Sequence, residues 1–219
     1  MSHTAKRSAL IPADTVTLDA DLVVPDGAAG VVLFAHGSGS SRLSPRNVQV
    51  ARGLQAGGFA TLLIDLLTAA EARIDDVTRH LRLDLPLLAR RLAGPIAWLG
   101  EESETRGLPI GLFGASTGAG AALIAAARQP TAVRAVVSRG GRPDLAGDAL
   151  PEVLAPTLLI VGGSDVRVIE LNEQAQRAMT ATTRLAIVPG AGHLFEEPGA
   201  LETVIQLARG WYTEHLIRA

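Results

Sequence analysis

The stretch IGLFGASTGAGAALIAAAR, residues 110–128, decides the fold. Its first four residues form an apolar run of strand length, and the alanine-rich part after Thr117, stopped by Pro130, is typical of a helix. A strand that passes into a helix through a tight, glycine-containing turn is the repeating unit of a parallel α/β sheet.

The same alternation continues along the whole chain. Ser44 is a candidate helix N-cap before Pro45, and Gly57 is a candidate stop. Strands that are apolar throughout are buried on both faces, so the sequence predicts a mostly parallel central sheet with right-handed crossovers and helices on both faces. The strand runs are residues 31–34, 60–64, 110–113, 132–137, 157–161 and 185–188, and further helices are expected at 85–99, 117–128, 168–179 and after Pro198.

Three segments are expected to be less regular. Residues 15–24 alternate apolar and polar side chains, which favours a more exposed strand or hairpin at the sheet edge. Residues 1–13 are expected to form an irregular N-terminal arm. Residues 68–82 follow the carboxyl end of a strand, where α/β sheets bind ligands, so we expect a minimal lid with little regular structure.

Composition limits the possible functions. The 219 residues fit one domain, residues 1–219, and a net charge of −2 offers no basic surface for nucleic acid. The absence of cysteine excludes disulfides, thiolate metal sites and a cysteine nucleophile. Lys6 is the single lysine, which excludes a P-loop. Neither a membrane span nor a secretory apolar segment is present, so we expect a cytoplasmic protein without membrane contact.

Ser116 is the candidate nucleophile. It lies in Gly-Ala-Ser-Thr-Gly, residues 114–118, which matches G-x-S-x-G between a strand and a helix, as in the nucleophile elbow. A serine nucleophile needs a base and an orienting acid, and after a nucleophile elbow these follow in the order Ser, Asp or Glu, His. Asp165 lies just past the strand run 157–161, and His193 lies in a glycine-rich loop after the last strand. The three side chains are therefore predicted to meet at the carboxyl edge of the sheet.

The glycine-rich loop 36–41 is the candidate oxyanion site. Its small residues let backbone N–H groups approach a ligand, and we expect the amides of Ser38 and Thr117 to hold the oxyanion. Gly37 and Gly39 are expected to contact the substrate. The alternatives are an ordinary glycine-rich turn and a nest for a phosphate.

Each candidate has a structural alternative. Asp165 also fits a turn or a helix N-cap, and His193 also fits an ordinary loop histidine. His36 is expected to hold its own loop rather than to transfer protons. No metal site can be assembled from the five scattered histidines, and a non-catalytic protein that binds a small ligand in the same cleft stays possible.

Together these motifs resemble the α/β-hydrolase superfamily, and the compact size is most similar to its dienelactone hydrolase-like branch. The resemblance spans about residues 15–216 and implies an α/β-hydrolase fold and a cofactor-free enzyme that opens esters or lactones through an acyl-enzyme. It implies Ser116 as nucleophile, His193 as base and then acid, and Asp165 as the partner that orients the imidazole. Authentic dienelactone hydrolases use a cysteine nucleophile and a glutamate near the oxyanion loop, whereas Ser116 and the HGSGSS loop stand in those places here and favour a general serine esterase. The resemblance is carried by residues 36–39, 114–118, 163–165 and 192–193.

Arg139 and Arg142 follow another strand end and are candidate substrate contacts. Either could pair with a substrate carboxylate, or it could stabilise its own surface loop. The sequence thus predicts a carboxylic ester hydrolase that acts on a small-molecule ester, without cofactor, metal, nucleic acid or membrane, as a monomer or homodimer. A thioesterase or a dienelactone-type hydrolase would share this machinery.

Overall fold

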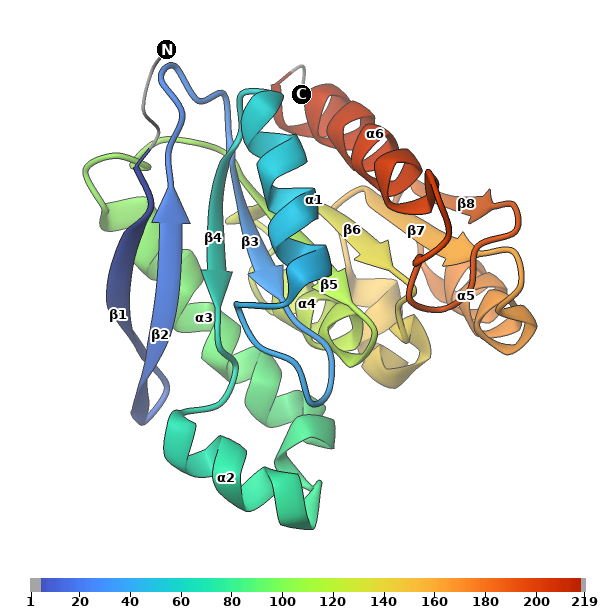
Figure 1. The fold of residues 1–219 in the computed structure, drawn as a ribbon, viewed down its shortest axis with the longest axis horizontal. Coiled ribbons are helices and arrows are strands. Elements are labelled where there is room, and N and C mark those ends of the chain that lie inside the picture. Colours follow the sequence, from blue (N-terminus) through green and yellow to red (C-terminus); the bar gives the residue numbers. More distant parts are fainter. Residues whose placement is uncertain (1–4, 218–219) are drawn as a thin grey trace.

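A computed structural model describes residues 5–217, which form one eight-stranded sheet with helices on both faces (Figure 1). The strands are β1 (Arg7–Ala13), β2 (Val16–Val23), β3 (Val31–Ala35), β4 (Ala60–Ile64), β5 (Ile110–Ala115), β6 (Val133–Arg139), β7 (Thr157–Gly162) and β8 (Thr183–Val188). The helices are α1 (Pro45–Ala56), α2 (Ala69–Thr78), α3 (Leu85–Glu101), α4 (Thr117–Arg128), α5 (Val166–Ala178) and α6 (Ala200–Tyr212), with shorter helical segments η1 (Leu81–Leu83), η2 (Pro143–Glu152) and η3 (Thr213–Ile217).

The strand order is β1-β2-β4-β3-β5-β6-β7-β8. All pairings from β4 to β8 are parallel, while β1 and β2 pair antiparallel with each other and β2 pairs antiparallel with β4. The order reverses direction around β3, and ligands bind beyond the carboxyl ends of the strands at such a point. The predicted mostly parallel sheet with helices on both faces is therefore confirmed.

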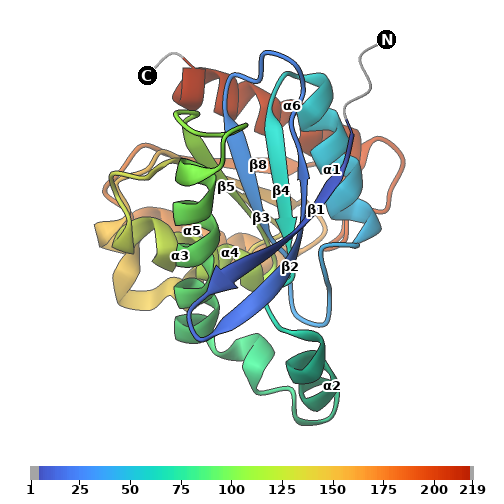
Figure 2. The same cartoon turned by 90° about the vertical axis from the view of Figure 1, so that its left-hand side faces the viewer.

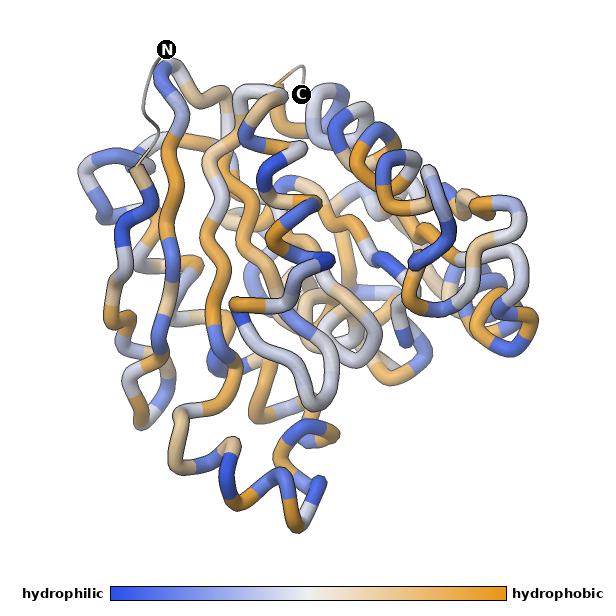
Figure 3. The backbone as a smooth tube through the Cα atoms, in the orientation of Figure 1, coloured by the Kyte–Doolittle hydropathy of each residue, from blue (hydrophilic) through white to orange (hydrophobic). Residues whose placement is uncertain are grey.

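The sheet is buried between two apolar cores. One core packs the sheet against α3 and α4, and the other packs it against α1 and α6. Every residue of β3, β4, β5 and β7 is buried, which explains why these strands are almost entirely apolar, with Thr61 and Thr157 as the buried polar residues. Figure 3 shows the hydrophobic colour running along the central strands, while the outer helices alternate between hydrophobic and hydrophilic residues.

The expectation of an irregular arm is wrong for residues 7–13. They form the edge strand β1, which pairs with β2 from Arg7 opposite Leu22 to Ala13 opposite Val16. Pro12 is tolerated because an edge strand does not need every backbone N–H for the ladder. Residues 1–4 of the predicted arm lie outside the described residues. Residues 15–24 do form part of an edge hairpin, as predicted.

The lid segment has more regular structure than we expected. It contains α2 and η1, and Figure 2 shows α2 standing out from the rest of the domain. Thr68 and Glu71 form a reciprocal capping box at the start of α2. The buried Arg91 of α3 donates to Glu71 and to the Leu66 carbonyl, and its hydrogen bonds hold the pKa of Glu71 below the ordinary value. The lid is thus tied to the domain at its first turn.

Candidate active site

Ser116 lies at the sharp turn between β5 and α4. Its backbone has φ 50° and ψ −123°, a conformation that a residue with a side chain rarely adopts. A Cβ atom at Gly118 would overlap the carbonyl oxygens of Ala35 and His36, so only glycine lets α4 begin this close to the end of β3. The strained serine is held by close backbone packing on both sides.

Asp165 and His193 form a hydrogen-bonded pair beyond the ends of β7 and β8. His193 Nδ1 lies 2.6 Å from Asp165 Oδ2. Asp165 stands at the N-cap position of α5 but makes no capping hydrogen bond there, so its carboxylate is directed to the imidazole instead. The loop after His193 contains Phe195 with φ 56°, a second strained residue.

A turn after β6 touches both Ser116 and His193. Ser116 N–H donates to the Arg139 carbonyl at 3.3 Å, and Arg142 N–H donates to the Ser116 carbonyl at 3.0 Å. At Gly140, in the same turn, a Cβ atom would lie 3.7 Å from His193 Nδ1. Within residues 5–217 no hydrogen bond joins Ser116 Oγ to the imidazole, a contact that often tightens only when substrate is bound.

The loop 36–41 covers the serine. A Cβ atom at Gly37 would lie 3.0 Å from Ser116 Cβ, so glycine allows this close approach. Ser38 N–H donates to Thr117 Oγ1 at 2.9 Å, which differs from our expectation of two free amides. The amide of Thr117 is the first of α4, where N–H groups have no partner inside the helix.

His36 holds the loop, as expected. Its Nδ1 lies 2.9 Å from the Gly37 carbonyl, and its Nε2 lies 2.9 Å from the Leu66 amide. The carbonyl can only accept and the amide can only donate, so the ring is neutral with its proton on Nδ1. Burial lowers the pKa of His36, which favours the same neutral form.

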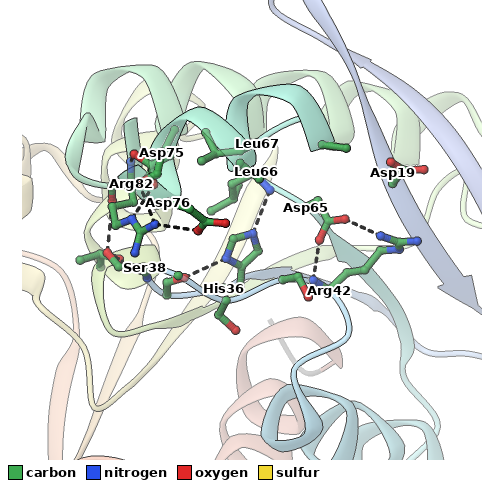
Figure 4. Close-up of a pocket in the computed structure, with 18 residues that line it drawn as sticks. Asp19, His36, Ser38, Arg42, Asp65, Leu66, Leu67, Asp75, Asp76 and Arg82 are labelled. Carbon is green, nitrogen blue, oxygen red and sulfur yellow. Dashed lines mark hydrogen bonds and ion pairs between the residues drawn. The ribbon is translucent and has the colours of Figure 1, made fainter. Parts of the chain in front are cut away.

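A cavity of about 240 Å³ lies between this loop and the lid (Figure 4). Gly37, Ser38 and Thr117 form the part of its lining that is nearest the nucleophile. Arg82 lies at the lid side, where its Nε is 2.5 Å from Asp75 Oδ2 and its carbonyl accepts from Ser38 Oγ at 3.3 Å. The rest of the lining mixes apolar side chains with four carboxylates. The apolar residues include Leu66, Leu67, Ala72 and Leu88, and the carboxylates are Asp19, Asp65, Asp75 and Asp76.

The two candidate substrate arginines differ in their surroundings. Arg142 forms two hydrogen bonds of 2.8 and 2.7 Å with Asp144, which is the structural alternative for this residue. Arg139 is 8% exposed, its Nη2 lies 3.3 Å from Asn47 Oδ1, and its Nε and Nη1 have no partner in the described part of the chain. Burial and the neighbouring Arg46 lower the pKa of Arg139 to about 10. Its guanidinium also lies 6.0 Å from the centre of the Phe195 ring.

Two kinds of site are not found in the part of the chain that the structure describes. No group of three or more His, Asp or Glu side chains is arranged to hold a metal ion. Nor does any helix there combine the length and the apolar character that crossing a membrane requires.

The sequence did not indicate three contacts of this site. They are the bond from Arg139 to Asn47, the bond from Ser38 N–H to the Thr117 hydroxyl, and the bond from Ser38 Oγ to Arg82. The partners are 92, 79 and 44 residues apart, so no local pattern signals them. The capping box of α2 did have a local signal, because Thr68-x-x-Glu71 matches the capping-box pattern.

Comparison with known proteins places this geometry in a family. A model of the dienelactone hydrolase family matches residues 18–208. A crystal structure of dienelactone hydrolase from Anabaena variabilis is 58% identical and superposes with a TM-score of 0.95, over 98% of this chain and 100% of that one. Est1E from Butyrivibrio proteoclasticus, also solved with ferulic acid bound, is 17% identical with a TM-score of 0.79 over 94% of this chain and 98% of that one, which shows a common fold.

A curated relative carries a different name. The protein named "Putative phosphoribosyl transferase" from Mycobacterium tuberculosis (strain CDC 1551 / Oshkosh) is 56% identical over 94% of this chain. The match covers 46% of that protein, so the chain spans about half the length of this relative. The family model and the 58% identical structure show that the chain has the α/β-hydrolase fold and belongs to the dienelactone hydrolase family.

Proposed function

We propose that this protein is a hydrolase that cleaves small carboxylic esters or lactones through an acyl-enzyme on Ser116. The observation that carries the proposal is the 2.6 Å contact between Asp165 and His193, which the turn at Gly140 joins to a serine in the strained elbow conformation. A carboxylate on Nδ1 keeps the proton there and leaves Nε2 free to act as a base. His193 is 40% exposed at its side chain, which suits a group that must meet both substrate and water.

The first half of the reaction forms the acyl-enzyme. Ser116 Oγ attacks the ester carbonyl carbon while its proton passes to His193 Nε2, and the carbonyl π electrons move onto the oxygen. The amide of Thr117 and, once it is released from the hydroxyl, the amide of Ser38 stabilise this oxyanion. The oxyanion then collapses, the ester C–O bond breaks, and the leaving alcohol takes the proton from His193.

The second half returns the free enzyme. Water gives a proton to His193 Nε2 and attacks the acyl carbon, and a second oxyanion forms in the same place. Its collapse breaks the bond to Ser116 Oγ, which takes the proton back from the imidazole, and releases the carboxylic acid. Asp165 stabilises the imidazolium in both halves without taking up its proton.

The cavity under the lid is proposed to hold one arm of the ester. It begins at Gly37, Ser38 and Thr117, the residues nearest the attacked carbonyl, and its volume of about 240 Å³ limits that arm to a small group. The named dienelactone hydrolase from Anabaena variabilis supports a lactone or an ester as the substrate class. A thioester would react by the same steps.

Arg139 is proposed to favour esters that carry an anionic acyl group. Two of its nitrogen donors are unpaired although the residue is nine-tenths buried, and a buried cation without a carboxylate is costly unless a ligand compensates it. The backbone carbonyl of Arg139 accepts from the Ser116 amide, and its guanidinium lies 6.0 Å from the ring of Phe195 in the loop that carries His193; both contacts support a role close to the reaction site. Arg142 stays a weaker candidate because Asp144 already binds it.

Replacement of the nucleophile tests the proposal. Ser116→Ala should lower kcat for a p-nitrophenyl short-chain ester by about 10⁶-fold, because the nucleophile and its base act as one unit. Ser103→Ala is the matched control, since this serine lies on the surface and bonds only to Glu102. Turnover by Ser116→Ala at the wild-type rate would contradict the proposal, and a wild-type protein without turnover on any ester, thioester or lactone would favour a non-catalytic binding protein.

A further inference from the structure

We infer that the side-chain hydroxyl of Thr117 is an additional hydrogen-bond donor to the oxyanion, beside the two backbone amides. The inference rests on the proposed ester hydrolysis and assigns a catalytic role to a side chain for which the G-x-S-x-G pattern has no requirement. In the substrate-free site the expected oxyanion donors of Ser38 and Thr117 bond to each other.

Thr117 Oγ1 lies at the centre of a small hydrogen-bond network. Ser38 N–H donates to it at 2.9 Å, and Ser38 Oγ lies 3.0 Å from it. Ser38 Oγ in turn lies 3.3 Å from the Arg82 carbonyl. The network therefore joins the first residue of α4, the oxyanion loop and the lid.

The chemistry of the groups fixes each donor. The Arg82 carbonyl can only accept, so Ser38 Oγ–H donates to it. Ser38 Oγ then has lone pairs but no further hydrogen, so Thr117 Oγ1–H donates to Ser38 Oγ. Thr117 Oγ1 uses a lone pair to accept the Ser38 amide. In the substrate-free site the Thr117 hydroxyl thus accepts the hydrogen bond from the Ser38 amide that the oxyanion accepts during the reaction.

An oxyanion changes the direction of this network. It is charged, so it is a stronger acceptor than a neutral hydroxyl and takes over the Ser38 amide. The hydroxyl and the amide of Thr117 belong to one residue, and both lie at the start of α4 beside Ser116. Rotation of the hydroxyl hydrogen from Ser38 Oγ to the oxyanion replaces a neutral hydrogen bond with a charge-assisted one. Thr117 is only 7% exposed, and water exclusion strengthens such a bond.

Thr117→Val removes the hydroxyl and keeps the branched shape and the backbone amide. We expect kcat for a p-nitrophenyl ester to fall by about 10- to 100-fold, up to the lower end of the loss that follows removal of one oxyanion donor, because both backbone amides remain. KM should change by less than about threefold. Thr117→Ser keeps a hydroxyl and should retain at least about a third of the wild-type kcat. Thr105→Val is the control, because it removes a buried threonine hydroxyl that donates to the Leu99 carbonyl, outside the site.

A pair of ketone inhibitors separates a donor from a residue that only holds the loop. A trifluoromethyl ketone forms a tetrahedral adduct with an oxyanion, whereas the matching methyl ketone binds without one. For Thr117→Val the inhibition constant of the trifluoromethyl ketone should rise by the same factor as kcat/KM falls, and that of the methyl ketone should stay within about twofold.

Three results would overturn the inference. They are an unchanged or higher kcat for Thr117→Val, an equal loss of affinity for both ketones, and a failure of Thr117→Ser to restore kcat when its thermal midpoint is normal. A wild-type protein without turnover would instead contradict the proposed function itself, so the two failures are distinguishable.

Discussion

Two arginines beside the catalytic edge of the sheet, Arg139 and Arg82, have opposite surroundings. Arg82 is held by two carboxylates, with Nε 2.5 Å from Asp75 Oδ2 and Nη2 3.3 Å from Asp76 Oδ1. Arg139 is more deeply buried at the end of β6 and has no carboxylate partner in the described part of the chain, only Asn47 Oδ1 at 3.3 Å. The hydrogen bond with Asp75 raises the pKa of Arg82, whereas burial lowers the pKa of Arg139 to about 10.

The difference shows how to separate structural charges from functional ones in this cleft. A buried charge that is paired inside the chain stabilises its own segment, as Arg82 does for the lid. A buried charge that is left unpaired lowers the stability of the folded protein. Its presence is accounted for if a bound substrate supplies the opposite charge. The comparison therefore predicts that removal of Arg139 changes substrate preference, while removal of Arg82 changes the lid.

The largest effect on kcat within this comparison is expected for Asp165→Asn, which tests whether a charge that is paired inside the chain can also be catalytic. Asp165 is paired, but with His193 and not with an arginine. Asp165→Asn keeps the shape and should lower kcat by about 10³- to 10⁴-fold, because a neutral amide cannot hold the correct tautomer or stabilise the imidazolium. Steady-state kinetics checks this against Asp144→Asn, which loses the ion pair with Arg142. A loss of kcat below tenfold for Asp165→Asn would remove this residue from the mechanism.

Arg139→Met tests the unpaired arginine. We expect the ratio of KM for an anionic ester to KM for a neutral ester of the same length to rise by about 10- to 100-fold, since one charge-assisted interaction is lost. The thermal midpoint should stay the same or rise, because a buried charge without a partner is removed. Arg90→Met is the control and should leave the ratio unchanged, because this exposed arginine pairs with Asp14 away from the site. An unchanged ratio for Arg139→Met would show that this arginine does not bind the substrate anion.

Arg82→Met tests whether the paired arginine stabilises the lid. We expect amide hydrogen exchange in α2 and η1 to become about tenfold faster, because the Asp75 and Asp76 partners are lost. The anionic-to-neutral KM ratio should stay within about twofold of the wild-type ratio. A rise in that ratio as large as the one expected for Arg139→Met would show that pairing within the chain does not separate the two arginines.

The smallest expected effect concerns the buried histidine of the oxyanion loop. The folded state lowers the pKa of His36, so the unfolded chain binds a proton first as the pH falls below about 6.5. His36 therefore contributes stability that is present above that pH and is lost as the pH falls, with a slope of at most about 1.4 kcal/mol per pH unit. Urea unfolding between pH 7 and pH 5 should show a shallower slope for His36→Gln, while the exposed His80→Gln should match the wild type. Equal slopes for His36→Gln and wild type would contradict the role of the neutral ring.

The sequence predicted the parts of the molecule that depend on local pattern. The buried central strands are almost entirely apolar, and Ser116, Asp165 and His193 each lie in a short loop of small residues at a strand end. The edge strand β1 was missed because Pro12 interrupts a short pattern, and its pairing with β2 is a tertiary property. The lid helix was missed although its capping box is visible in the sequence.

The remaining features depend on residues that are far apart along the chain. Arg142 pairs with Asp144 only two residues away, but Arg139 meets Asn47, 92 residues away. Only the folded structure therefore shows that the Arg139 guanidinium has no carboxylate partner in the described part of the chain. In the same way, the hydroxyl of Thr117 meets the Ser38 amide because α4 and the oxyanion loop pack together. Pattern analysis places backbone segments at the site, but the state of each polar group follows from packing.

Reaction with a fluorophosphonate tests the central claim most directly, because only a serine activated by its histidine is phosphonylated rapidly. Peptide mass mapping of the wild-type protein should find one adduct, on Ser116, and His193→Ala should reduce its rate of formation by at least about 100-fold. An unlabelled wild-type protein, or an adduct that forms on another serine, would contradict the account.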